Sequence, residues 1–145
     1  MLIDGSLSLS AAQLVTATAY STNVIDRGPV AVAFGYAGAA GNIPIMLDVE
    51  TTFTAGGSAT MTIQVLSGTS ATAGSGTVVT HYSSFAIPVA SLVAGTDINR
   101  LFRLGIPTNC GRYVYLQYVI ATGPMTAGAI SAKVAMAVPT QPLTP

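Results

Sequence analysis

The sequence predicts an all-β protein, an antiparallel β-sandwich or barrel, on three observations. Short runs of alternating apolar and polar side chains recur at spacings of about ten residues. Turn-forming residues separate these runs, and no stretch has the convincing period of a long helix. The 145 residues also make one domain of ordinary size. We therefore predict a single sandwich domain across residues 1–145.

The alternation is clearest near the C-terminus. In Arg112–Ala121 the apolar even-numbered positions would face the core, which places Tyr113 and Tyr115 on the opposite face of the strand. The turn Thr122–Pro124 follows, and Ala129–Val138 resumes the alternation. The two runs are typical of a β-hairpin with a longer loop.

Ile45–Phe53 is the other clear strand, with Asp48 and Glu50 on its outward face. Ala59–Ser67 follows a glycine-rich turn and is interpreted as its hairpin partner. A single helical turn or an irregular crossover is expected in Ala90–Asp97, and Gly68–Gly76 is expected to be a surface loop. Further strands are expected at Val15–Thr22, Val30–Phe34, Thr77–Ser83, Phe85–Val89 and Arg100–Gly105.

The two ends are predicted to be extended arms. Met1–Ser10 is weakly patterned and suits an arm or an edge segment as well as a first strand; we assign it as an N-terminal arm. Pro139–Pro145 alternates proline with polar residues, which prevents another sheet strand.

Composition limits the possible partners. Charged residues make up 7% of the chain, against about 25% in an average soluble domain, while 50% is apolar. A compact β-protein coated with Ser and Thr would explain this, and so would an exterior covered by other protein. The formal net charge is zero and the five cations are scattered, so we expect no nucleic-acid partner. The charge-free run Gly28–Leu47 contains prolines and glycines, so we expect no membrane span, and no secretory signal is visible.

We expect no catalytic residue, no cofactor and no metal. His81 is the sole histidine, and the sequence leaves open a dyad with Cys110 or a triad with Asp97, but no nucleophile elbow is present. Asp48 and Glu50 could share a cation, although two carboxylates are far fewer than the ligands calcium needs. Zinc needs three or four ligands at characteristic spacings, and Cys110 has no second cysteine to pair with.

Two separated stretches carry a family resemblance. Gly111–Leu116 followed by Met125–Gly128, and near the other end Ala12–Ala17 and Ser21–Asp26, resemble the capsid cement (decoration) proteins of tailed bacteriophages of the Bordetella-phage type. The resemblance implies a jelly roll. It also implies a non-enzymatic virion protein, made in the host bacterial cytoplasm and bound to the outer surface of the capsid.

The expected partners are further copies of the chain, as a homodimer or homotrimer, and the phage major capsid protein. A tyrosine row offers a large contact area at low entropic cost, so Tyr113 and Tyr115 are the first candidates for the interface. Arg100, Arg103 and Arg112 are the remaining candidates. The rival hypothesis is a jelly-roll module that binds carbohydrate or a host surface, which the absence of tryptophan disfavours.

Overall fold

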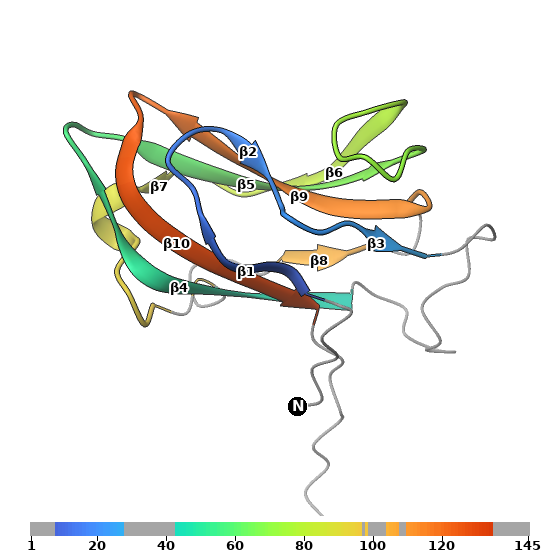
Figure 1. Cartoon of the computed structure of the whole chain (residues 1–145), viewed down its shortest axis with the longest axis horizontal. Coiled ribbons are helices and arrows are strands. Elements are labelled where there is room, and N and C mark those ends of the chain that lie inside the picture. The colour runs from blue at the N-terminus through green and yellow to red at the C-terminus, as the bar shows by residue number, and fades with distance from the viewer. Residues whose placement is uncertain (1–7, 28–42, 97, 99–103, 108–109, 135–145) are drawn as a thin grey trace, which may run out of the picture.

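The computed structural model describes residues 8–27, 43–96, 98, 104–107 and 110–134. Their strands form two antiparallel sheets that pack face to face, one across the upper part of Figure 1 and one below it. The predicted all-β sandwich is therefore confirmed. Helical structure in the described residues is limited to 3₁₀ geometry at Ile98 and in the turn η2 (Val89–Ser91). η2 lies at the start of the predicted turn or crossover.

The first sheet has the order β1-β10-β4-β8. Its strands are β1 (Ser8–Leu14), β4 (Ile43–Ala55), β8 (Leu104–Ile106) and β10 (Met125–Val134). The second sheet has the order β2-β9-β5-β6, with β3 also on β9 and β7 also on β5. Its strands are β2 (Ala19–Tyr20), β3 (Ile25–Asp26), β5 (Thr60–Gly68), β6 (Val78–Ser83), β7 (Ile87–Pro88) and β9 (Tyr113–Ala121).

These orders are those of a jelly roll. The short strands β2 and β3 both pair with β9, and β6 and β7 both pair with β5, so each couple is one interrupted strand. Counted this way, the described part of the chain has eight successive strands, arranged 1-8-3-6 in one sheet and 2-7-4-5 in the other. The jelly roll implied by the resemblance is confirmed.

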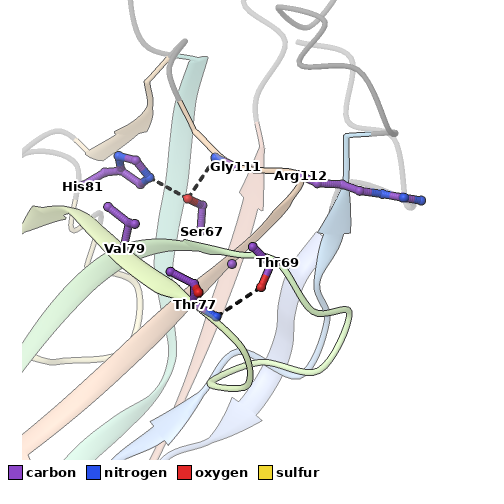
Figure 2. A pocket seen from close by; sticks show the side chains of 8 residues that line it. Ser67, Thr69, Thr77, Val79, His81, Gly111 and Arg112 are labelled. Atoms are coloured by element: carbon purple, nitrogen blue, oxygen red, sulfur yellow. Dashed lines mark hydrogen bonds between the residues drawn. The ribbon is translucent and has the colours of Figure 1, made fainter.

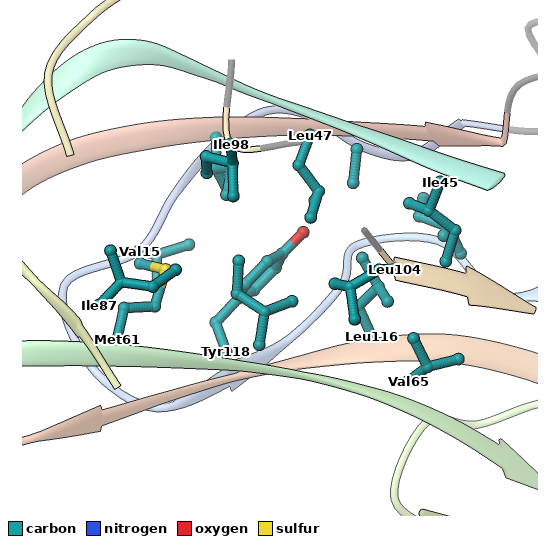
Figure 3. Packing of buried hydrophobic residues seen from close by; sticks show 14 of the residues in the cluster. Val15, Ile45, Leu47, Met61, Val65, Ile87, Ile98, Leu104, Leu116 and Tyr118 are labelled. Atoms are coloured by element: carbon teal, nitrogen blue, oxygen red, sulfur yellow. The ribbon is translucent and has the colours of Figure 1, made fainter. Parts of the chain in front are cut away.

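The core fills the space between the inner faces of the two sheets (Figure 3). In β4 the odd-numbered Ile45, Leu47 and Val49 are buried, whereas Asp48 and Glu50 are exposed, as the alternation predicts. The apolar residues of β5 and the even-numbered residues of β9 face them from the second sheet. Each such buried aliphatic side chain contributes about 1.5–3 kcal/mol.

Both predicted hairpins are wrong. β9 and β10 lie in opposite sheets, as do β4 and β5, so each connection crosses the sandwich from one sheet to the other. Two strands whose inner faces pack across a core show the same alternation as two strands that pair side by side. In the turn that connects β9 to β10 across the sandwich, Thr122 and Gly123 both have positive φ.

The N-terminal segment is also corrected. Leu9 and Ser10 are fully buried in β1, which pairs with β10, so the end of the predicted arm Met1–Ser10 belongs to the sheet. Within the predicted strand Val15–Thr22, only β2 is a strand. The remaining part of that arm, 1–7, the predicted strand 30–34 and the C-terminal arm 139–145 lie outside the described residues.

A polar network joins the two sheets through the core. The Tyr118 hydroxyl of β9 crosses to β1 and lies 2.8 Å from the Ser10 hydroxyl, and Figure 3 shows it pointing away from its own sheet. Ser10 donates its single proton to Gln13 Oε1 at 2.7 Å, so Tyr118 is the donor to Ser10. Gln13 Nε2 in turn donates to the Tyr20 carbonyl at 2.8 Å. Burial raises the pKa of Tyr118 well above its ordinary range, which keeps this hydroxyl a donor.

Gly128 is a position where the fold leaves no room for a side chain. Its φ is +139°, and a Cβ there would overlap the ring of Phe53. We expect Gly128→Ala to lower the free energy of unfolding by about 3 kcal/mol or more, from strain and overpacking together. Gly57→Ala is the control, because nothing lies within 4 Å of a Cβ at Gly57. Denaturant titration checks this, and similar losses in both variants would contradict it.

Candidate functional site

The predicted interface residues differ in how far the structure describes and exposes them. Arg100 and Arg103 lie outside the described residues. Arg112 is exposed and binds Asp26 through two hydrogen bonds, Nε to Oδ1 at 2.8 Å and Nη2 to Oδ2 at 2.9 Å. Its guanidinium also stands 4.9 Å from the centre of the half-buried Tyr113 ring. These contacts hold the Arg112 side chain in a local cluster with Asp26 and Tyr113, and the hydrogen bond to Asp26 raises the pKa of Arg112.

Tyr115 is a correction to the expected contact surface. It lies on the predicted outer face of β9, but it is fully buried, so its ring is not available to a partner. The ring packs edge-on against Tyr20 at a centroid distance of 5.6 Å. The β5–β6 connection covers this pair, because a Cβ on Gly74 would lie 2.6 Å from the Tyr20 ring. Within the described structure the buried Tyr115 hydroxyl has no hydrogen-bond partner.

A pocket of about 560 Å³ opens at the Gly68 end of β5 (Figure 2). It lies between the end of the β5–β6 hairpin and the turn that leads into β9. Its lining combines hydroxyl and methyl groups with one imidazole and one guanidinium. The lining residues are Ser67, Gly68, Thr69, Thr77, Val79, His81, Gly111 and Arg112.

A hydrogen-bonded pair forms the inner part of this pocket. His81 Nε2 lies 2.6 Å from Ser67 Oγ, which also accepts a hydrogen bond from the Gly111 amide at 2.9 Å. His81 reaches Ser67 because β6 has a bulge there: Val65 pairs with Tyr82, whereas the next residue, Leu66, pairs with Thr80. The extra residue in β6 is therefore His81, and a bulge re-aims the side chain it carries.

The electrostatics of the pair keep the imidazole neutral. Partial burial, together with the positive charge of Arg27, lowers the pKa of His81. Arg27 Nη1 donates to the carbonyl oxygens of Cys110 and Gly111, which fixes the turn beside the pocket. Burial raises the pKa of the Cys110 thiol to about 11, with Arg27 opposing the shift, so Cys110 is a thiol rather than a thiolate at neutral pH.

The geometry of the pair favours positioning over nucleophilic chemistry. Ser67 is only 2% exposed, and its oxygen already accepts the Gly111 amide. A catalytic serine needs an accessible oxygen and a histidine that a third group orients. Ser67 instead ties together β5, the bulge of β6 and the turn before β9. This contact could not be predicted from the residue pattern, because a bulge of one residue leaves no mark in the alternation.

The remaining candidate sites are a metal site and a membrane-spanning segment. Among the residues that the structure describes, no three His, Cys, Asp or Glu side chains are placed to hold a metal ion. Asp48 and Glu50 both lie on the exposed face of β4. Over the same residues, no helix has the length and apolar character needed to cross a membrane.

The edge strand β6 carries exposed apolar side chains that the sequence analysis did not single out. Val78, Val79 and Tyr82 are 36%, 49% and 39% exposed, and Phe85, which follows β6, is 53% exposed. Two adjacent valines break the alternation of a half-buried strand, and that pattern was a usable signal. No Asp, Glu, Lys or Arg occurs between Glu50 and Asp97, so this part of the second sheet is uncharged.

Comparison with known proteins gives one family. The model of the family described as Bbp16 matches residues 9–134, a span that runs from β1 to the end of β10. A search of curated proteins gives no match.

The two fully buried tyrosines allow a matched test of the polar network. We expect Tyr118→Phe to lower the free energy of unfolding by about 1–2 kcal/mol, because a buried hydrogen bond is lost. Tyr115→Phe should leave stability unchanged or raise it by up to about 1 kcal/mol, since its buried hydroxyl has no hydrogen-bond partner among the described residues. Chemical denaturation of both variants checks this; equal losses would show that the two hydroxyls are equivalent.

His81 should make stability depend on pH. Its pKa is lower in the folded chain than the ordinary value of 6.5, so the unfolded chain binds the proton first. This contribution to stability is complete above about pH 6.5 and is lost as the pH falls toward the folded pKa. Denaturation midpoints measured between about pH 7.5 and 5.5 should fall with pH in the wild type. His81→Gln should flatten the profile, because the chain has no other histidine; an unchanged slope would count against His81 as its source.

Proposed function

Because the chain belongs to the Bbp16 family, we propose that it is a structural virion protein of a tailed phage. In this proposal it oligomerises and binds the outer surface of the capsid, where it cements junctions between major capsid proteins. The resemblance of its two end segments to phage cement proteins supports this role, and the jelly roll is the fold which that resemblance implies.

The observation that carries the proposal is the uncharged, apolar edge at β6. Exposed apolar side chains that cluster on a protein with few charges mark a surface that other protein covers. Val78, Val79, Tyr82 and Phe85 place four such exposed side chains along this edge within eight residues of the chain. This edge replaces the predicted tyrosine row of β9 as the proposed contact surface, because Tyr115 is buried.

The rival function is recognition of carbohydrate or a host surface. The pocket at Ser67 favours it to the extent that Thr69, Thr77 and His81 offer polar groups to a sugar. Sugar sites commonly add exposed aromatic rings for stacking, but the described residues that line this pocket include no Phe, Tyr or Trp. A glycan-binding screen with the purified protein separates the two functions, since a cement protein needs no glycan.

A cement protein stabilises its particle by linkage. Whatever binds the assembled shell but not the free subunits shifts assembly by RT ln(1 + [L]/Kd) per site. We therefore expect particles loaded with the protein to withstand higher temperature or denaturant than particles without it. Because few charges are involved, binding should weaken only slightly between low and moderate salt.

The measurement is thermal disruption of particles with and without the protein, repeated across a salt series. Equal stability of loaded and bare particles would refute the cementing role. A steep loss of binding with salt would instead refute the apolar mechanism. Light scattering after size exclusion tests oligomerisation separately, and a strictly monomeric protein at micromolar concentration would remove that part of the proposal.

A further inference from the structure

We propose that the open edge of β6 binds an extended, uncharged segment of the capsid protein as an additional strand, with one apolar side chain of that segment in the Ser67–His81 pocket. This inference rests on the proposed function and names the surface that performs it. Three features of the described structure support it: the unpaired edge, the pocket beside that edge, and the absence of Asp, Glu, Lys and Arg from β5 and β6.

The edge is available for pairing. β6 pairs with β5 on one side, and no described strand pairs with its other side, so about half of its backbone amides and carbonyls point outward. Natural edges are usually blunted by lysine or proline. Proline closes the β7 half of this edge at Pro88, whereas Val78–Ser83 contains neither residue. The open part of the edge is therefore confined to β6.

The pocket lies where an added strand would direct a side chain. Val79 is paired with Ser67, so both project from the same face of the sheet, and both line the pocket. A residue opposite Val79 on an added strand would project from that face too, next to Val79. Main-chain pairing with a pocket for alternate side chains is how sheet edges recognise extended peptides. A volume of about 560 Å³ admits even an aromatic side chain.

The lack of charge on β5 and β6 determines which kind of segment can bind there. The residues from Thr51 to Thr96, which include all of β5 and β6, carry no formal charge apart from any on His81. The nearby Arg112 is already held by Asp26 in two hydrogen bonds. Arg27, whose charge acts on His81, donates to the Cys110 and Gly111 carbonyls. A charged side chain in the segment would lose its hydration without gaining a counter-ion on β5 or β6, so the matching segment is uncharged.

The bulge argues against a second copy of β6 as the occupant. It leaves only Val78–Thr80 as a regular run before His81. Two bulged β6 strands paired with each other would set each irregularity against the partner, which limits the ladder to very few bonds. A segment without a bulge brings no second irregularity, so it can pair along the whole of Val78–Thr80 beside the pocket.

The experiment compares Val79→Lys with Val93→Lys for binding to particles that lack the protein. Val79 and Val93 are matched in exposure, at 49% and 47%, but Val93 follows η2 and does not line the pocket. A lysine at the edge blocks strand addition and places a charge beside the pocket. We expect Val79→Lys to weaken binding by on the order of tenfold or more, and Val93→Lys to bind like the wild type.

Hydrogen exchange on the wild-type protein supplies a second readout that needs no variant. The amides of Val78–Ser83 should exchange more slowly on the particle than in the free protein, whereas those of the exposed turn Gly56–Ser58 should not change. If the wild type binds, but Val79→Lys binds equally well and β6 is not protected, the edge site is overturned and the cement function stands. If the wild type binds no particle, both fall. A change in the mass of the free protein caused by Val79→Lys would assign the edge to a second copy and overturn the capsid segment as its occupant.

Discussion

The hydrogen bond from Tyr118 to Ser10 is the interaction on which the arrangement of the N-terminal strands depends. It carries a hydroxyl across an otherwise apolar core, and Gln13 continues the chain of contacts to the segment that follows β1. A buried hydroxyl without a partner would destabilise the folded state by about 1–3 kcal/mol. The register of β1 that places Ser10 beside Tyr118 avoids this cost. A buried polar pair of this kind contributes specificity, because a slipped strand would leave Tyr118 without an acceptor.

The faces of the strands could be predicted from the sequence, but their partners could not. Alternation in β4 and β9 correctly placed Ile45, Leu47 and Leu116 inside and Asp48 outside. Alternation says which side chains are buried together; it does not say whether two strands pair or face each other across a core. The hairpin predictions for β4 with β5 and for β9 with β10 failed for this reason, whereas the resemblance correctly implied the jelly roll.

The candidate site was less predictable because it depends on departures from regular strands. A single extra residue turns His81 toward Ser67, and a folded connection covers Tyr115 on what would otherwise be an open sheet face. Neither feature changes the pattern of residue types enough to be recognised. The uncharged stretch around β6 was visible in the sequence, but its significance appears only when β6 is known to be an edge strand.

The order of strands in the first sheet has a consequence for how the chain acquires its structure. Among the described strands β1 pairs only with β10, and in this pair Ser8 lies opposite Lys133. During synthesis the first strand therefore has no edge to join until almost the whole described chain has left the ribosome. Long-range pairing of this kind makes folding slow and leaves apolar strands transiently exposed. Folding of this domain is thus expected to be completed after translation, with the last strand laid into the sheet between the first strand and β4.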